Sequence, residues 1–237
     1  MKKTHSIGII LNLLLKLFFI VLFLLPSFAF QRFHQYNTEL YINPPLIRIT
    51  KNIEIENYGN VGIVPGEMIF RILNINESQI INISAKDEYG NIFPTKVVPS
   101  ENFVELVVEN YIPIFAQSKQ KVFIEYTLLI KTSSLLFYSF EYPLIDTTIP
   151  IKEGKIYIKL PNNLHLTYAP NVICESKNNC YFEIKNQKNK MIEFEVSKLP
   201  LPLLKVRASN LFWYGLISAL ILVTIIQIVV RKLLRKR

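Results

Sequence analysis

Hydrophobic and polar residues alternate along the middle of this chain, and a long apolar block stands on either side of it. The two blocks cover Ile7–Phe30 and Leu211–Val230. Alternation with a period of two is typical of β-strands that bury one face. No stretch of comparable length in the middle shows the 3.6-residue period of an amphipathic helix. The clearest alternating runs are Ile47–Thr50, Ile53–Glu56, Val104–Val107, Lys121–Tyr126, Lys155–Leu160 and Met191–Val196.

Turn-forming pairs such as Pro65-Gly66 and Glu153-Gly154 separate these runs. Strands without intervening helices predict an all-β fold, built as an antiparallel β-sandwich. About 178 residues lie between the two blocks, which is more than one seven-strand sandwich usually takes. We therefore predict two small sandwiches, over residues 30–132 and 133–198. Residues 199–210 follow as a proline-containing stem, because proline cannot join a central strand ladder.

The C-terminal block predicts a transmembrane helix over residues 211–230. It contains 20 residues without a charge, close to the length that a helix needs to cross about 30 Å of hydrocarbon. Trp213 and Tyr214 lie at its outer edge, where aromatic rings prefer the membrane interface. The basic residues of 231–237 form a short tail that is expected in the cytoplasm. Gly215 and Ala219 form a pair of small residues four apart, which would let another transmembrane helix pack closely.

The N-terminal block has the layout of a signal peptide over residues 1–29. Basic Lys2 and Lys3 precede an apolar stretch, and small Ser27 and Ala29 occupy the positions that a signal peptidase needs. An uncleaved signal anchor is the alternative, although Lys16 interrupts the block and favours cleavage. Either outcome leaves the middle of the chain outside the cytoplasm. The sequence thus predicts a type I single-pass membrane protein, facing the cell exterior or an internal lumen.

The positive charge of the chain belongs to its ends. The formal net charge is +9, but 8 of the 27 basic residues lie before residue 30 or after residue 230, where no acidic residue occurs. The middle holds 19 basic and 18 acidic side chains, a net charge of +1. Such a balance creates no field that would steer a polyanion, so a nucleic-acid partner is not expected. The basic clusters indicate a lipid bilayer as the partner instead.

Two kinds of covalent modification are predicted in the exported part. Cys174 and Cys180 flank a run of turn-forming residues, which favours a disulfide that closes a hairpin. A ring this small stabilises the fold by about 2 kcal/mol in the loop-entropy model. Asn76 and Asn82 both stand in the acceptor pattern for N-linked glycans. Asn82 lies in a predicted strand and would qualify only if its side chain points outward.

The sequence shows no pattern typical of catalysis. His34 and His165, the histidines of the middle region, stand in neither a metal-binding nor a Ser/His/Asp context, and we interpret both as surface residues. The pairs Glu54/Glu56 and Glu193/Glu195 have a spacing of two, which places both carboxylates of a pair on one face of a strand. We expect that face to be the solvent face, where a carboxylate lacks the raised pKa of a general acid. No enzyme, metal or cofactor is therefore predicted.

Several segments occur in the order of motifs known from one family. Ile53–Asn60 is a strand ending in Asn-Tyr-Gly-Asn, and Gln117–Tyr126 is a charged turn followed by Val-Phe-Ile-Glu-Tyr. Phe137–Ser139, Thr147-Thr148 and Ile158–Pro161 follow, so that the likeness covers about 110 residues. This order resembles the ribophorin I family, type I membrane subunits of the eukaryotic oligosaccharyltransferase with a β-sandwich luminal region. The resemblance implies a non-catalytic luminal subunit and assigns no functional residue. This chain is shorter than that family and ends in a seven-residue tail.

Together these observations predict a non-catalytic membrane protein whose exported β-sandwich region binds partners or acts as a scaffold. Two alternatives stay open. The first is an accessory subunit that supports protein N-glycosylation in complex with a multi-span membrane protein, as the resemblance implies. The second is a membrane-tethered hydrolase, whose site would gather His165 and a carboxylate in one pocket.

Overall fold

The computed structural model describes residues 31–73, 75–101, 103–130, 135–144, 146–176, 179–184 and 191–234, with side chains up to Gln227 in the last range. The predicted signal peptide lies outside the described residues, as does the end of the predicted tail from residue 235 onward.

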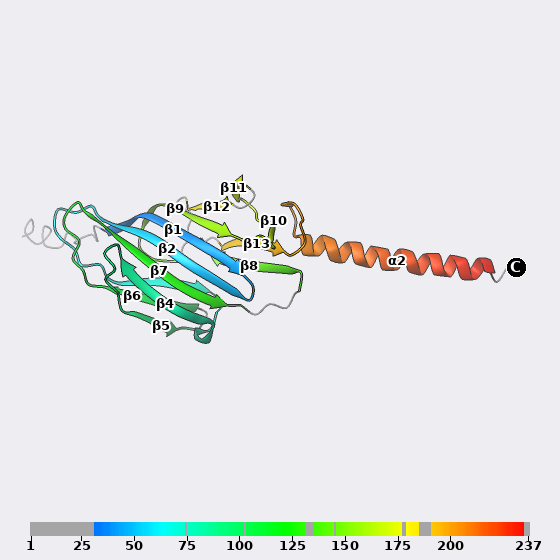
Figure 1. Ribbon diagram of the computed structural model, residues 1–237, viewed down its shortest axis with the longest axis horizontal. Coiled ribbons are helices and arrows are strands. Elements are labelled where there is room, and N and C mark those ends of the chain that lie inside the picture. The colour runs from blue at the N-terminus through cyan, green and yellow to red at the C-terminus, as the bar shows by residue number, and fades with distance from the viewer. Residues whose placement is uncertain are drawn as a thin grey trace, which may run out of the picture.

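The described chain is mostly β-structure and ends in one long helix (Figure 1). This confirms the predicted β-rich region and C-terminal apolar helix. The strands form three sheets, and the largest has the order β11–β12–β9–β1–β2–β7–β4. Its strands are β1 (Gln31–Asn43), β2 (Leu46–Asn57), β4 (Ile80–Asp87), β7 (Lys119–Leu129), β9 (Ile151–Lys159), β11 (Ile173–Ser176) and β12 (Asn179–Ile184).

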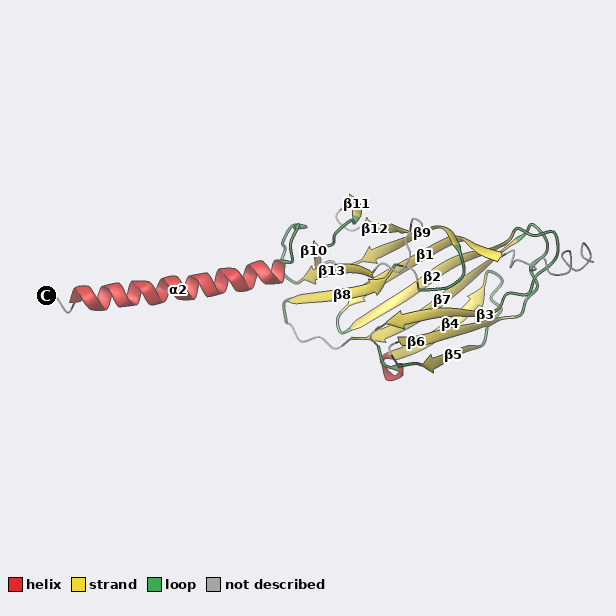
Figure 2. Ribbon diagram, turned by 180° about the vertical axis from the view of Figure 1, so that it is seen from behind, coloured by secondary structure: helices red, strands yellow, loops and turns green. Residues whose placement is uncertain are grey.

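Two smaller sheets of three strands each complete the β region (Figure 2). One has the order β3–β6–β5 and the other the order β10–β13–β8. A short 3-10 helix, η1 (Glu77–Gln79), precedes β4. The strands of the smaller sheets are β3 (Gly66–Leu73), β5 (Thr95–Pro99), β6 (Phe103–Asn110), β8 (Phe137–Pro143), β10 (His165–Tyr168) and β13 (Met191–Ser197).

The hydrophobic core lies between the large sheet and the smaller ones. Alternate residues of β1 and β2 are buried, as the period of two in the sequence requires. The ring of Phe33 in β1 lies parallel to that of Phe70 in β3, with 6.4 Å between the ring centroids. Phe140 of β8 stacks on Phe194 of β13 at 5.1 Å, and both belong to the same cluster of buried side chains as Phe33 and Phe70. Side chains from all three sheets therefore meet in one core.

Two features of the predicted arrangement differ from the structure. The pairing is not antiparallel throughout, because β1 and β9 run parallel, with Thr38 opposite Ile156. The large sheet also joins strands from both predicted sandwiches, and buried residues of both belong to one hydrophobic cluster. The boundary between 30–132 and 133–198 therefore does not separate two cores. An alternating pattern shows which face of a strand is buried, but it does not identify the neighbouring strand.

Gly154 shows how the parallel pairing constrains the sequence. The pair Glu153-Gly154 was predicted as a turn, but it lies inside β9, opposite Gln35 and Tyr36 of β1. A Cβ atom at position 154 would overlap the carbonyl oxygen of Tyr36. Glycine is therefore required here by the close approach of two strands and not by a turn.

The apolar helix α2 (Ala208–Leu234) begins three residues before the predicted span and extends past its predicted end. Residues Ala208–Gln227 form a stretch that is long and apolar enough to cross a membrane. The segment before α2 was predicted as a proline-containing stem over residues 199–210. Within this segment Leu204 pairs with Tyr168 of β10, and its backbone N–H donates to the carbonyl of Thr167 at 2.8 Å. The helix therefore follows a segment that is packed on the β region.

Candidate functional site

A pair of opposite charges is buried in the core. The ammonium of Lys51 in β2 lies 2.6 Å from a carboxylate oxygen of Asp146, which follows β8. The two side chains are 0% and 1% exposed. Neither residue belongs to a pattern that the sequence analysis recognised, because Lys51 stands in an ordinary strand and Asp146 is 95 residues away.

The phenols of Tyr36 and Tyr142 complete the hydrogen bonding of this pair. The Lys51 ammonium donates to the hydroxyl of Tyr36 at 2.8 Å and to that of Tyr142 at 3.0 Å. Both hydroxyls in turn donate to the carboxylate of Asp146. Buried charges are tolerated when their polar atoms are satisfied in this way. We call these four residues the buried charge cluster.

Burial disfavours the charged forms of Lys51, Tyr36 and Tyr142 and shifts the pKa of each accordingly. Desolvation lowers the pKa of the Lys51 ammonium, although the neighbouring Asp146 carboxylate partly opposes the shift. Desolvation raises the pKa of the Tyr36 and Tyr142 phenols, and the negative charge of Asp146 raises both further. The cluster is closed to solvent and its polar atoms are occupied by one another. The buried charge cluster is therefore a structural element that links β1, β2 and the end of β8.

The carboxylates Glu54 and Glu56 lie on the other face of the sheet beside His34. Glu56 accepts a hydrogen bond from Arg32 at 2.6 Å, and this bond holds the pKa of the Glu56 carboxyl below its usual range. A general acid needs the opposite shift. His34 Nδ1 is 3.3 Å from Glu56, while Lys119 pairs with Glu54 at 3.2 Å. Within the described ranges, no group of three or more His, Cys, Asp or Glu side chains is arranged to hold a metal ion.

His165 lines a cavity with a volume of about 320 Å³. None of the described residues that line this cavity is a carboxylate, so it does not gather His165 with an acid as the hydrolase alternative requires. The walls are largely apolar, and the other lining residues are Leu160, Leu164, Leu166, Cys174, Ser176, Cys180, Leu201, Pro202 and Leu203.

The two carboxylates of the second predicted pair, Glu193 and Glu195, differ in burial. Glu193 is partly exposed and pairs with Arg207 at 2.8 Å, but Glu195 is completely buried. The two share one face of β13, as predicted, yet the start of α2 covers one end of that face. The backbone N–H of Ser209 and the hydroxyl of Thr167 donate to Glu195 at 3.2 and 3.1 Å, and the Ser209 hydroxyl donates to it as well. The solvent face expected from the strand pattern is here an interface.

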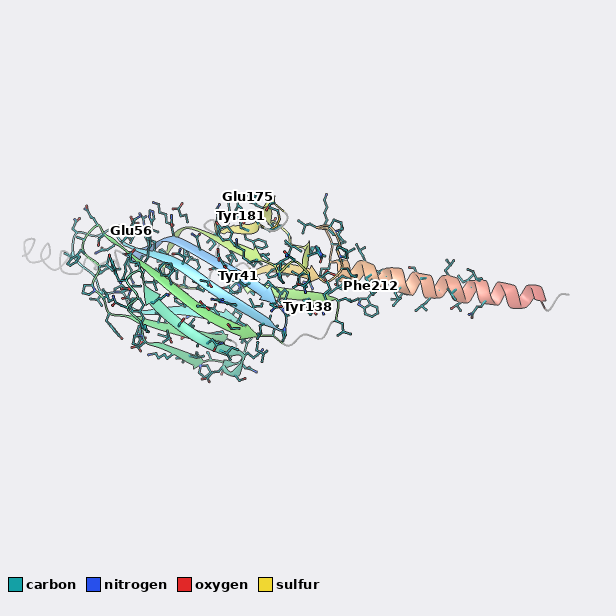
Figure 3. All side chains as sticks on the ribbon, viewed as in Figure 1. Tyr41, Glu56, Tyr138, Glu175, Tyr181 and Phe212 are labelled. Carbon is teal, nitrogen blue, oxygen red and sulfur yellow. A yellow bond between two sulfur atoms is a disulfide. The ribbon has the colours of Figure 1, made fainter. Side chains whose placement is uncertain are left out.

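This carboxylate joins the helix to the β region. The first backbone N–H groups of a helix have no partner within the helix, and the helix dipole favours a negative charge beside them. Glu195 meets both demands at Ser209, the second residue of α2. One turn further on, the ring of Phe212 lies 5.6 Å from that of Phe137 at the start of β8, close to Tyr138 (Figure 3). We call this contact region the helix junction.

The structure describes all four residues that were predicted for modification. Cys174 and Cys180 form a disulfide between opposed positions of β11 and β12. Asn76 precedes η1 and Asn82 lies at an irregularity in β4, and both are exposed. Glycosylation at either residue stays a prediction.

The predicted helix-packing face is open in the structure. Apart from the adjacent backbone of α2 itself, a Cβ atom at Gly215 would meet no atom within 4 Å, and Ala219 is exposed on the same face of α2. A partner helix at this face stays a prediction.

Comparison with known proteins gives no family for this chain. No family model and no curated protein matches it, so the likeness to ribophorin I stays a prediction. One similar solved structure is yeast LTA4 hydrolase in complex with bestatin, with a TM-score of 0.42 and 11% identity over 73% of this chain and 29% of that chain. Another is an M1 zinc metallopeptidase from Deinococcus radiodurans bound to a Tyr-Ser-Ala substrate, with a TM-score of 0.38 and 10% identity over 70% of this chain and 42% of that chain. The chain thus spans less than half the length of either protein, and likenesses this distant carry no argument about activity.

Proposed function

We propose that this chain is a non-catalytic, single-pass membrane protein whose β-sandwich region binds or scaffolds other molecules at the membrane surface. In this topology α2 crosses the bilayer, the β region lies outside the cytoplasm and the basic C-terminal residues lie inside. The helix junction carries the proposal. Because Glu195 binds the first turn of α2 directly, the orientation of the β region follows that of the membrane helix.

The chemistry of the described residues supports binding more than catalysis. The strongest cluster of ionisable groups, around Lys51 and Asp146, is closed to solvent. The carboxylates beside His34 are neutralised by Arg32 and Lys119. A rigid β region that is held at a fixed angle to the membrane helix can present its outer loops to a partner, and binding then loses little additional conformational entropy. The disulfide suits an oxidising compartment, which agrees with export.

An accessory role in a larger membrane complex is the second candidate. The small residues Gly215 and Ala219, which lie on one face of α2, favour it, because such residues let a second helix approach closely in a bilayer. If the complex is an oligosaccharyltransferase, as the ribophorin I likeness implies, the chain would support N-glycosylation without itself transferring glycans.

Gentle detergent extraction of the tagged full chain, followed by native mass analysis, tests both candidates. We expect a stoichiometric complex with at least one other protein. A multi-span partner that is lost in Gly215→Leu, but kept in Ile217→Leu on the opposite side of the helix, would support the accessory role. A partner kept in both variants would indicate binding through the β region. A bare monomer would overturn the scaffolding function.

A further inference from the structure

The end of the β region at the helix junction exposes several large apolar side chains. Leu135 is 82% exposed, the highest value for any leucine on the described surface, and Leu136, Leu203 and Val206 are also exposed. We call these four residues the apolar rim. Isolated surface leucines need no explanation, but a group at one end of a domain indicates an interaction surface.

The backbone of the rim is held in place by hydrogen bonds. The N–H of Lys198 donates to the carbonyl of Leu136 at 3.0 Å, and the Tyr138 hydroxyl donates to the carbonyl of Leu135 at 3.3 Å. Leu203 directly precedes Leu204, which pairs with β10. The exposure of these side chains is therefore a property of the folded junction.

The contact between Phe137 and Phe212 sets the level of the rim along the membrane normal. Phe212 lies four residues, or about 6 Å, beyond the start of α2. The next residues, Trp213 and Tyr214, are the aromatic pair that prefers the membrane interface. Because Phe137 touches Phe212, the start of β8 lies at that same level, and Leu135 and Leu136 directly precede it (Figure 1).

The charge around the rim fits a surface of anionic headgroups. From Ser197 to Gln227 the chain carries three basic residues and no acidic one. Lys198 and Lys205 are exposed beside the rim, and Arg207 pairs with Glu193. Apolar side chains flanked by lysines are typical of segments that lie in the interface of a bilayer.

We propose that the apolar rim inserts into the headgroup layer of the bilayer, so that the β region rests on the membrane at its junction end. The partner is a phospholipid surface that contains anionic lipids. This inference rests on the proposed function, because it requires that α2 spans the membrane. Its consequence is that the β region is fixed by two contacts, the helix and the rim, and cannot swivel about the helix axis.

Site-directed fluorescence on the full chain in lipid nanodiscs tests the insertion. Both native cysteines form the disulfide, so an introduced cysteine is the only free thiol. Leu135→Cys is labelled with a polarity-sensitive fluorophore, in discs of phosphatidylcholine with 30% phosphatidylglycerol, and lipids with a nitroxide at the headgroup serve as quenchers. We expect a blue-shifted emission and at least a twofold loss of intensity with the quencher.

Phe115→Cys is the matched control at the opposite end of the β region. Phe115 is 78% exposed, and its carbonyl accepts a hydrogen bond from Asn57 at the far end of β2, next to Glu56 (Figure 3). The 11 residues of β7 separate the two ends by about 35 Å. A label at position 115 is therefore expected to show neither the blue shift nor the quenching.

A third label distinguishes failure of the rim from failure of the span. Leu220→Cys lies in the middle of α2, and deep nitroxide lipids should quench it. If this label is quenched but the one at Leu135 is not, the rim proposal is overturned and the span stands. If the label at Leu220 is also unquenched, the proposed topology fails with it. A blue shift at Leu135 without lipid quenching would indicate a protein contact and would overturn the lipid assignment.

Discussion

The buried pair of Lys51 and Asp146 gives the sharpest test of how this core is held together. We consider Lys51→Met, which keeps an unbranched side chain one atom shorter than lysine but removes the charge. The carboxylate of Asp146 would then stay in a site where it is 1% exposed, with the phenols of Tyr36 and Tyr142 as its remaining side-chain donors among the described residues. Removing one partner of a buried ion pair costs about 3–5 kcal/mol, because the remaining charge is uncompensated.

Urea denaturation of the full chain in mild detergent, followed by far-ultraviolet circular dichroism, measures this loss. With a urea dependence of about 2 kcal/mol per molar, a loss of about 4 kcal/mol lowers the unfolding midpoint by about 2 M. Asp146→Asn should act in the same direction. The double variant should be less destabilised than the sum of the single variants by at least about 1 kcal/mol, because the two groups interact directly.

Lys96→Met provides the matched control. Lys96 lies 2.7 Å from Glu67, almost the same separation as in the buried pair, but its side chain is 46% exposed and that of Glu67 is 44% exposed. Water replaces much of such an interaction, so the unfolding midpoint of this variant should stay close to that of the wild type. Equal midpoint shifts for the two lysine variants, or a shift below about 0.5 M for Lys51→Met, would refute the reasoning.

Three further predictions concern pH, the helix junction and the surface. The buried phenols of Tyr36 and Tyr142 have raised pKa values, so above about pH 10 the unfolded chain releases protons that the folded chain retains. The free energy of unfolding should therefore fall above that pH, by up to about 1.4 kcal/mol per pH unit for each of the two phenols. The lowered pKa of Lys51 makes the free energy of unfolding rise with pH, but only below about pH 10.4, the pKa of an unfolded lysine. Between pH 8 and about pH 10 the urea midpoint should therefore rise slightly or stay level, and between about pH 10 and pH 11 it should drop. Glu195→Gln should speed amide hydrogen exchange in the first turn of α2 about fivefold, and unchanged protection there would contradict the capping role. In a eukaryotic secretory host, Asn76→Gln and Asn82→Gln should each remove one glycosidase-sensitive mobility shift, and a wild-type chain that is insensitive to the glycosidase would refute both sites.

The predictions that succeeded depend on local patterns. Runs such as Lys121–Tyr126 and Met191–Val196 alternate in the sequence and lie in β7 and β13. The disulfide between Cys174 and Cys180 spans six positions of one hairpin, and its spacing was visible in the chain. The predictions that failed concern residues whose partners are distant. The local pair Glu153-Gly154 indicated a turn. The strand that requires the glycine, β1, lies more than a hundred positions earlier in the sequence, so no local pattern reveals it.

The sequence by itself determined the β-rich character of the middle, a helix long and apolar enough to cross a membrane, and the cysteine pairing. Each of these follows from neighbours along the chain, through side-chain alternation or an uncharged run of sufficient length. Only the tertiary structure decided that β9 joins β1, that Lys51 and Asp146 are buried together, and that Glu195 caps α2. These contacts depend on which surfaces meet once the sheets pack. The local sequence around a charged residue is the same whether its strand is exposed or lies in a core, so it does not show which charges become buried.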